Sequence, residues 1–568
     1  MKLKRLSIGT LGLLAVSGFA WSCSGKSEDC NANLTCAPYG GEVGYGGGSG
    51  AASASGSSGT TGTSGGASGK GGGSSSGAGN SGDGGADAAA GSGGAPPPTC
   101  DGTLSPDVDA CVVSDEYGVF VSPTGIDAGA DGTQAHPFAT VSAALAHISK
   151  IKHVYVCVGD GDYLEPDTLQ IPDRVSIYGG FTCVGGTWKY DSATPAHLIS
   201  SQPIGAMITN AKVGVVIQDL RLDAANAPED GTGANSFGLM ISGSQGIALK
   251  RVEIRAGKGG KGKSGADGAM GVDGLPSTDA QKGVAGSCVN PAASQPGAQS
   301  VAKICESQGG IGGTAFFGTA YSAMQDGSSA YLVTPSNGGK GGEQHASNAD
   351  PGKNGDNGAR GEKGTAAPLL GTFSEGGYKV ASGGNGAVGK PGQGGGGGGA
   401  SLGSATCIGA SGGAGGMGGC GGEPGIGGIG GGASVALLSW QSVVSLDNCK
   451  LTAGAGGAGG DAGKGHAGGV GKSGGAGGEG DGVNFGNGGD GGKGGIGGGG
   501  GNGSGGTGGP SIALVYDGTP VTQVTPSTLS FSTTPAAAGK GGTLGQPGDY
   551  GYDGSKGLTQ DIYPKPQI

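Results

Sequence analysis

Hydrophobic residues along this chain gather in short runs that are separated by long polar and glycine-rich stretches. The runs VYVCVG at 154–159 and VSIYGGF at 175–181 have the length and the β-branched and aromatic content of buried strands. Upstream of them, Phe138, Val141 and Leu145 recur at the spacing of one helix face. The pattern therefore predicts a strand-rich region that contains one short helix.

The strand-like runs also form an internal repeat, in which each copy joins two apolar runs rich in β-branched residues and leucine. The four copies join 207–209 to 215–222, 238–241 to 247–254, 435–438 to 443–451, and 512–515 to 529–531. A unit of this size cannot bury its apolar face alone, so stacking of the units around one continuous core is predicted. The alternative is that the strand pairs belong to separate sandwiches.

The start of the strand-rich region contains VSPTGID at 121–127, GTQAHPFAT at 132–140 and VYVCVGDGDY at 154–163. This succession resembles the N-terminal cap and first coils of bacterial right-handed parallel β-helix domains of the pectate-lyase-like type. The resemblance covers 117–257. It implies an all-β fold, a right-handed parallel β-helix with an N-terminal capping helix. Further coils are then expected at 433–454 and at 510–568, where the last coil precedes a C-terminal tail.

Composition changes this picture, because the chain has 144 glycines and 27 prolines among 568 residues, as low-complexity or fibrous segments do. Two glycine-rich blocks, 258–432 and 455–509, interrupt the repeat and are expected to be long insertions between coils. Glycine recurs at every third position in 259–274, 352–364, 386–398 and 465–480. These runs are too short and too poor in proline for a collagen triple helix.

Two structures remain open for the glycine-rich insertions. Extended helices with three residues per turn would pack closely side by side, as in polyglycine II, whereas a disordered loop has the same composition. The composition, with GGAGG at 412–416, resembles that of the PGRS-type glycine-rich surface proteins.

The N-terminus has the organisation of an export signal. Positive residues at 2–5 precede an apolar segment too short to span a membrane, so 1–22 is predicted to be a signal peptide. Residues 20–23 (AWSC) resemble the lipobox of bacterial lipoproteins, which implies lipidation of Cys23; ordinary cleavage near Ala20 is the alternative. Ser24 stands where an inner-membrane retention signal has Asp, so the resemblance implies an outer-membrane, cell-surface lipoprotein.

The residues after Cys23 read as an anchor and a stalk. Residues 23–40 hold a small cysteine loop, and 41–98 consist almost entirely of Gly, Ser and Ala. A flexible tether is predicted there, with an r.m.s. span of roughly 40–45 Å. A second cysteine loop is expected at 99–116.

The chain has 12 cysteines, in keeping with export to an oxidising compartment. Sequence alone leaves their connectivity open, and pairing between neighbours is the simplest hypothesis. The candidate disulfides are Cys30–Cys36, Cys100–Cys111, Cys157–Cys183, Cys288–Cys305 and Cys407–Cys420. Cys449 is then left over. No CxxC pair is present, so a zinc site is not expected.

Charge and motifs exclude several functions. A net charge of −11 repels phosphate backbones, so nucleic acid is not an expected partner. Residues 257–264 fit the phosphate-loop pattern, but no helical pattern follows them to face a nucleotide. Residues 456–461 match the first six positions of a calcium-binding nonapeptide and lack the apolar residue that should follow. No metal or other cofactor is therefore predicted.

Candidate catalytic residues come only from analogy with β-helix enzymes that cleave acidic polysaccharides. Because alternate residues of a strand point the same way, Asp219, Arg221 and Asp223 are expected to line one outer face. The corresponding residues one coil later are Lys250, Arg251 and Glu253. A solvated, salt-bridged face explains the same residues. No histidine has an evident Ser or Cys nucleophile for a partner.

Two function classes follow. The first, which the tether, the lipid anchor and the glycine repeats favour, is a non-catalytic cell-surface lipoprotein that acts as a structural, adhesive or matrix- or glycan-binding module. Its expected partners are the membrane, through the lipid, and extracellular polysaccharide or other surface proteins. The alternative is a polysaccharide lyase or glycoside hydrolase on the β-helix scaffold, which only fold analogy supports.

Overall fold

The computed structural model of the protein describes residues 100–148, 153–159, 161–300, 303–322, 325–331, 337–344, 346–543 and 549–564. They belong to the second of two compact units, Gly93–Ile568, and the first unit, Met1–Ser92, lies outside them. The predicted signal peptide (1–22), the lipidation site Cys23, the Cys30–Cys36 pair and the tether (41–98) therefore also lie outside the described residues.

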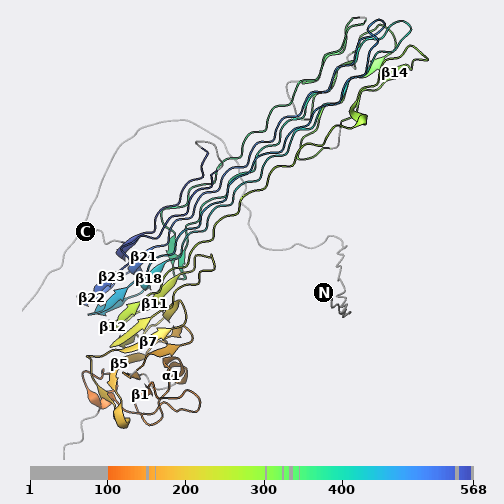
Figure 1. Ribbon diagram of the computed structural model, residues 1–568. Coiled ribbons are helices and arrows are strands. Elements are labelled where there is room, and N and C mark those ends of the chain that lie inside the picture. The colour runs from red at the N-terminus through yellow and green to blue at the C-terminus, as the bar shows by residue number, and fades with distance from the viewer. Residues whose placement is uncertain are drawn as a thin grey trace, which may run out of the picture. The chain divides into compact units, whose positions relative to one another are not determined.

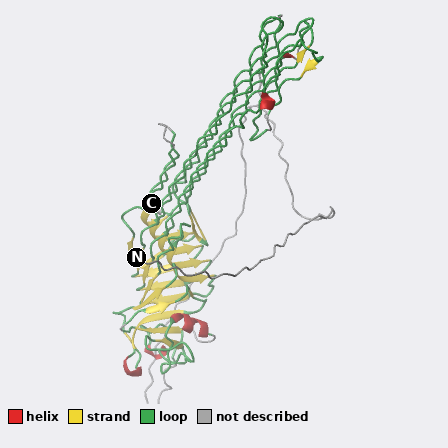
Figure 2. Cartoon of the chain, turned by 45° about the vertical axis from the view of Figure 1, so that its right-hand side comes forward, coloured by secondary structure: helices red, strands yellow, loops and turns green. Residues whose placement is uncertain are grey.

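Most strands belong to three parallel sheets, and from β7 onward consecutive strands enter the sheets in turn, an arrangement we call the three-sheet stack (Figure 2). Sheet 1 contains β1 (Gly118–Val121), β2 (His153–Cys157), β5 (Ser176–Thr182), β9 (Val215–Gln218), β12 (Ile247–Lys250), β19 (Val444–Asp447) and β22 (Thr522–Thr525), with β6 (Lys189–Tyr190) antiparallel to β5. Sheet 2 contains β3 (Tyr163–Glu165), β7 (Ala196–Ser200), β10 (Leu220–Asp223), β13 (Glu253–Arg255), β20 (Lys450–Thr452) and β23 (Thr528–Ser530). Sheet 3 contains β4 (Leu169–Gln170), β8 (Ile204–Thr209), β11 (Ser236–Ser242), β18 (Ser434–Trp440), β21 (Ser511–Asp517) and β24 (Thr559–Tyr563). The fold is thus all-β with parallel sheets, as predicted.

The core of the stack consists of aliphatic side chains at equivalent positions of successive strands. In sheet 1, Leu249 of β12 is paired with Ile217 of β9 and Leu446 of β19. In sheet 2, Ile254 of β13 is likewise paired with Leu222 of β10. All five are buried in one continuous hydrophobic cluster. A one-residue slip of register would turn them to solvent, so this cluster holds the strands in place.

The predicted helix is α1 (Val141–His147), and it packs against the first strands of the stack. Thr140 is its N-cap, and the Thr140 hydroxyl accepts a hydrogen bond from the backbone N–H of Ala143 at 3.1 Å. The buried carboxylate of Glu165 accepts hydrogen bonds from the N–H groups of Val141 at 2.7 Å and Ser142 at 3.1 Å. Val141 is buried in the core of the stack, so the helix closes the apolar end of the first strands.

The glycine-rich residues leave the stack as extended segments that run out and back, and Figure 1 shows them side by side. We call the described residues of 257–371, 380–433, 453–510 and 535–558 the glycine bundle. Its hydrogen bonds recur every third residue: Gly259, Gly262 and Gly265 donate to the carbonyls of Ala455, Ala458 and Asp461 at 2.8–2.9 Å. The described glycine-rich segments are therefore ordered and have the three-residue period expected of a polyglycine-II arrangement.

Close approach of backbones explains why the repeat uses glycine. A Cβ on Gly395 would lie 2.1 Å from the carbonyl oxygen of Gly492, and one on Gly427 would lie 2.1 Å from that of Gly383. Real Cβ atoms do not approach an oxygen so closely, so each of these positions excludes a side chain.

The number of glycines in each triplet follows the number of neighbouring segments. Beyond its base, where it also bonds to 227–234, the segment 258–275 bonds to two neighbours, 412–432 and 455–475, and it mostly has one glycine in three. The segment 412–432 lies between several neighbours, is largely buried, and mostly has two glycines in three. In the run of six glycines at 394–399, an added Cβ would meet a carbonyl oxygen of another segment at every position, within 2.1 Å.

Asparagine and aspartate side chains complete the hydrogen bonding along the rim of the glycine bundle. The side-chain oxygens of Asn354 and Asn357 accept hydrogen bonds from the backbone N–H groups of Lys493 and Ile496, both at 2.8 Å. Asp267 accepts from the N–H of Lys464 in the same way, also at 2.8 Å. These side-chain oxygens accept hydrogen bonds from backbone N–H groups that do not bond to a backbone carbonyl.

Two short hairpins and three 3-10 turns complete the described secondary structure. They are β14 (Ser294–Gln295) with β15 (Ala315–Phe316), β16 (Thr372–Ser374) with β17 (Gly377–Lys379), and the 3-10 turns Ala110–Val112, Val184–Gly186 and Asp279–Gln281. The predicted last coil contains a further excursion, because residues 536–542 and 551–557, between β23 and β24, hydrogen-bond to segments of the glycine bundle. That excursion was missed because it carries few glycine triplets.

The disulfides follow the predicted neighbour pairing only in the stack. Cys100–Cys111 and Cys157–Cys183 are formed as predicted. The predicted pairs Cys288–Cys305 and Cys407–Cys420 are wrong, because the bonds are Cys288–Cys407 and Cys305–Cys420. Antiparallel segments of the bundle bring these distant cysteines to the same level: the backbones next to Cys288 and Cys407 are bridged at Ser287 and Ile408. Cys449 is buried and unpaired among the described residues.

Three consecutive glycines test the packing of the bundle. We expect Gly498→Ala and Gly500→Ala each to lower the free energy of unfolding by about 1–3 kcal/mol, because the added Cβ would lie 2.0 Å from a carbonyl oxygen. Gly499→Ala should change it by less than about 0.5 kcal/mol, since the nearest atom to its Cβ is 3.4 Å away. Thermal unfolding of the three variants measures the difference, and equal effects would contradict close packing.

The disulfide pattern is testable by peptide mapping under non-reducing conditions. We expect linked peptides that contain Cys288 with Cys407 and Cys305 with Cys420, because each pair joins adjacent segments of the bundle. Recovery of Cys288 linked to Cys305 would contradict the observed arrangement of segments. The pairs enclose 119 and 115 residues, so their reduction should also lower stability by up to about 5 kcal/mol each.

Candidate functional site

Aromatic clusters cover part of the outer faces of sheets 1 and 3, whereas the outer face of sheet 2 carries charged residues. On sheet 1, Tyr155 and Phe181 belong to an aromatic cluster, and the hydroxyl of Tyr155 donates to the carbonyl oxygen of Val112 at 2.5 Å. On sheet 3, Phe237 packs in a cluster with Tyr378 of the β16–β17 hairpin. Sheet 2 is therefore where the sequence-predicted polar residues have to be sought.

The structure separates the three residues that were expected on one outer face. Arg221 and Asp223 lie on the outer side of β10, but Asp219 occupies the turn between β9 and β10 with a φ of 53°. Its side chain is 1% exposed and points away from the other two, toward Arg251. The expectation of a common face was wrong because the positive φ at this turn interrupts the alternation of side chains.

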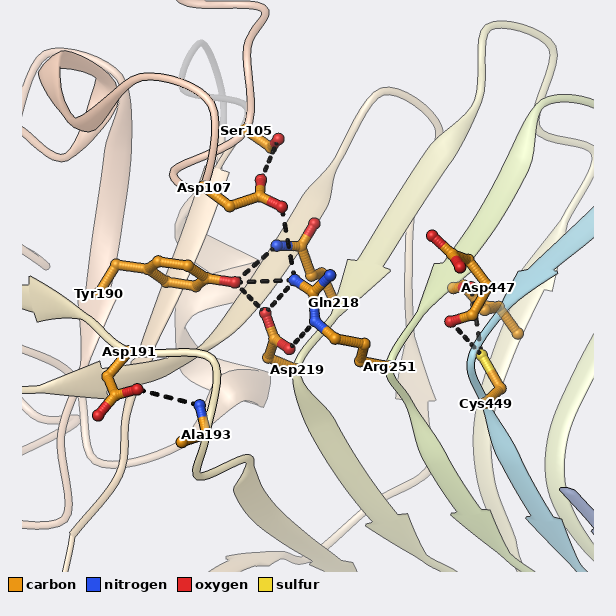
Figure 3. Close-up of polar contacts among 11 residues, drawn as sticks. Ser105, Asp107, Tyr190, Asp191, Ala193, Gln218, Asp219, Arg251, Asp447 and Cys449 are labelled. Carbon is orange, nitrogen blue, oxygen red and sulfur yellow. Dashed lines mark hydrogen bonds and ion pairs between the residues drawn. The ribbon is translucent and has the colours of Figure 1, made fainter. Parts of the chain in front are cut away.

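Asp219 is instead the centre of a buried polar network (Figure 3). Arg251 binds it with two hydrogen bonds, from Nε at 2.6 Å and from Nη2 at 2.9 Å. The hydroxyl of Tyr190 donates to the same carboxylate, and Gln218 donates to the Tyr190 oxygen at 3.0 Å. Arg251 also reaches Asp107, 3.5 Å away, so the network fastens the N-terminal loop and β6 to sheet 1.

The charges of this network are stabilised rather than available for proton transfer. The hydrogen bond to Asp219 raises the pKa of the Arg251 guanidinium above its ordinary value, although burial opposes it. Burial, with the hydrogen bond to Asp219, raises the pKa of Tyr190 to about 12. Partial burial acts to raise the pKa of Asp107, but hydrogen bonds from Ser105 and Gln218 lower it overall. At neutral pH the arginine is thus protonated and Asp107 ionised, which disfavours roles as base and acid.

The outer face of sheet 2 is a ladder of paired charges. Arg221 donates from Nε to Asp223 at 3.0 Å, and Asp223 lies 3.1 Å from Nε2 of His197. His197 Nδ1 lies 2.6 Å from Asp162. One strand further along, Glu253 pairs with Arg255 and Lys450. Lys250, which is paired with Gln218 in sheet 1, takes part in no ion pair among the described residues.

The ion pairs favour the ionised forms of two of these groups, Glu253 and Arg221. Partial burial acts to raise the pKa of Glu253, but hydrogen bonds from Arg255 and Lys450 lower it overall. The hydrogen bond with Asp223 raises the pKa of Arg221, against the effect of burial. The arrangement corresponds to the salt-bridged face weighed as an explanation of these residues.

The two nucleotide-like and calcium-like patterns lie within the glycine bundle. In 257–264, the N–H groups of Gly259 and Gly262 donate to carbonyls of a neighbouring segment instead of facing an open loop. In 456–461, Asp461 accepts a hydrogen bond from the backbone N–H of Lys540 at 2.7 Å. Both patterns are products of the glycine repeat, and within the described ranges no group of three or more His, Cys, Asp or Glu side chains is arranged to hold a metal ion.

Three residues of these sites were not predicted from the sequence. Tyr190 and Asp107 contact Asp219 and Arg251, and His197 lies between two carboxylates. The repeat did contain a signal for the turn, because Asp219, Arg251 and Asn448 occupy equivalent positions and have φ values of 51–53°. Aspartate and asparagine tolerate this conformation better than most residues. Pairing with Tyr190 depends on the antiparallel β6, which no repeat pattern indicated.

Comparison with known proteins adds little to this description. No protein-family model matches the sequence, and no characterised protein matches it at a significant level. A solved structure described as a rhamnogalacturonan lyase is 13% identical with a TM-score of 0.19, over 26% of this chain and 38% of that one. The chain thus spans less than two thirds of that lyase, and a likeness of this size carries no argument about activity or substrate.

No helix in the described part of the chain is both long and apolar enough to cross a membrane.

The network around Asp219 predicts an asymmetry between two arginines that are four residues apart in the sequence, Arg251 and Arg255. Arg251→Ala should lower the free energy of unfolding by about 3–5 kcal/mol, since it leaves the carboxylate of Asp219 buried without a cation. Arg255→Ala should cost no more than about 1 kcal/mol, because the Arg255–Glu253 pair is partly solvated. Urea unfolding of both variants checks this, and similar losses would refute the structural role of the network.

Proposed function

We propose that this chain is a non-catalytic cell-surface lipoprotein that acts as a structural, adhesive or matrix- or glycan-binding module, held at the outer membrane by a lipid on Cys23. The observation that carries the proposal is the ordered glycine bundle. Backbone hydrogen bonds between its adjacent segments make it a stiff projection from the three-sheet stack. A stiff projection suits presentation of a surface at a distance.

The direction of the chain supports this role. The first strand of the stack, β1, lies on the part of the stack away from the glycine bundle in Figure 1. The segment 486–510 would extend roughly 75 Å at about 3.1 Å per residue. The disulfides Cys288–Cys407 and Cys305–Cys420 tie together the outer loops of the bundle, which differ in sequence from the glycine repeat. In the proposed role, these loops, a cleft on sheet 3, or both would contact extracellular polysaccharide or other surface proteins.

We also infer that the three-sheet stack is a right-handed parallel β-helix of the pectate-lyase-like type. Its support is the passage of successive strands through three parallel sheets and the end-covering helix α1. Parallel strands connected by crossovers are right-handed in about 98% of proteins. We also infer from its composition that the glycine bundle is similar to the glycine-rich segments of PGRS-type surface proteins.

The enzyme alternative has less support. Cleavage of acidic polysaccharides needs an unpaired base or a metal beside the substrate. Of the six candidate residues, all but Lys250 are engaged in ion pairs among the described residues. Incubation of the purified protein with acidic and neutral polysaccharides, with and without calcium, discriminates the two classes. Release of unsaturated or reducing-end products would favour the lyase or hydrolase and direct attention to Arg221 and Asp223.

Lipidation of Cys23 is testable in cells. The full chain should be found in the outer-membrane fraction and should be cut by protease added to intact cells. Cys23→Ser should abolish attachment of the lipid and move the protein to a soluble fraction, because a single side chain carries the anchor.

A matched control lies one residue further along. Ser24→Asp should keep the protein lipidated and move it to the inner membrane, if the resemblance to lipoproteins extends to sorting. A periplasmic location of the unaltered chain, together with resistance to external protease, would contradict the proposal.

A further inference from the structure

A cleft lies on the outer side of sheet 3, beside the edge of the β16–β17 hairpin. Its lining comes from four parts of the chain that are distant in sequence. They are the hairpin (Gly371, Thr372, Phe373), the ends of β18 and β21 (Trp440, Val515, Tyr516, Asp517) and the end of β24 (Tyr563, Pro564). The residues used below are Phe373, Trp440, Tyr516, Asp517 and Tyr563.

Strand register explains why these residues meet. Trp440 of β18 is paired with Asp517 of β21, and Val515 of β21 is paired with Tyr563 of β24. The hairpin then places Phe373 against Tyr563, with ring centroids 5.5 Å apart at an angle of 43°. The rings of Phe373, Trp440 and Tyr563 are half-buried, so each keeps part of its surface toward the cleft.

Polar groups stand beside these rings. The indole N–H of Trp440 and the hydroxyls of Tyr516 and Tyr563 have no hydrogen-bond partner among the described residues and are not sealed from solvent. Asp517 accepts a hydrogen bond from the side chain of Gln441 on one carboxylate oxygen, which leaves the other oxygen open. The cleft thus offers aromatic surface together with several donors and acceptors.

This combination matches the chemistry of a pyranose ring. A sugar has an apolar C–H face that packs on an aromatic ring and a rim of hydroxyls that both donate and accept hydrogen bonds. Asp517 is the one charged residue in the lining of the cleft, and no Lys or Arg lines it. A uronic acid or sulfated sugar would meet a like charge there without a compensating cation, so the cleft favours a neutral sugar.

We propose that this cleft is a binding site for neutral pyranose units of a surface or matrix polysaccharide, with Trp440 as the stacking platform and Asp517 as a hydroxyl acceptor. The inference rests on the proposed glycan-binding role and names its ligand class. The ligand proposed here is neutral, whereas the β-helix enzymes considered from the sequence cleave acidic polysaccharides.

The test is titration calorimetry of the full chain with hexasaccharides of glucose, mannose and N-acetylglucosamine, with hexagalacturonate as the acidic comparison. At least one neutral hexasaccharide should bind, and Trp440→Ala should weaken its affinity tenfold or more. Asp517→Asn, which keeps the shape of the side chain, should weaken it roughly threefold or more. Tyr331→Ala removes an exposed tyrosine from the outer loops of the bundle and should leave affinity unchanged.

Fluorescence gives a second readout that does not depend on the alanine variant folding. The chain has three tryptophans, Trp21, Trp188 and Trp440, and Trp21 belongs to the predicted signal peptide. Sugar binding at the cleft should shift the emission of the mature protein. The shift should persist in Trp188→Phe and disappear in Trp440→Phe, a variant that retains an aromatic ring.

The outcomes separate this inference from the proposed function. Sugar binding that is unchanged in Trp440→Ala and Asp517→Asn would show that the cleft is not the binding site, and the proposed glycan-binding role would remain. Loss of binding in Tyr331→Ala alone would place the site in the outer loops. Tighter binding of hexagalacturonate than of every neutral sugar would overturn the ligand class. Binding of none of the sugars would overturn the inference, while the anchor on Cys23 stands or falls by cell fractionation.

Discussion

Close contact between backbones without side chains is the constraint on which most of this molecule depends. In the glycine bundle, N–H groups at every third residue donate to carbonyls of adjacent segments, and an added Cβ would meet those carbonyl oxygens at about 2 Å at most positions. A hydrophobic core is therefore unnecessary along the bundle, because buried amide groups are satisfied by one another. Triplets carry more glycines where more segments surround them, and asparagine or aspartate side chains complete the pairing at the rim.

The same constraint explains how insertions of this length leave the stack intact. A segment that runs out along the bundle returns along a neighbour, so the chain re-enters the stack beside the place where it left. Glu253 of β13 is thus paired with Lys450 of β20 although the first excursion separates them. The stack contains the aliphatic core, and the bundle extends away from it with few apolar side chains.

The two parts divide the work in the function that we propose. The stack holds most of its candidate charged residues in internal pairs, with Asp219 and Arg251 joining the N-terminal loop to sheet 1. Its sheet 3 has a second layer, in which the β16–β17 hairpin brought in by the first excursion meets β18, β21 and β24. The cleft at that edge exists only because the excursion returns there.

Much of the architecture was determined by local pattern alone. The apolar runs predicted strands that correspond to β8–β13, β18–β21 and β23, whereas β22 was missed. The helical spacing predicted α1, and the three-residue glycine period predicted extended segments as one of two possibilities. Tertiary structure decided the order of those segments, the partners of Cys288 and Cys305, the separation of Asp219 from Arg221 and Asp223, and the meeting of Trp440, Phe373 and Tyr563. The physical reason is that periodicity reports which side of a segment is buried, whereas the identity of the neighbour depends on where a long excursion turns and returns.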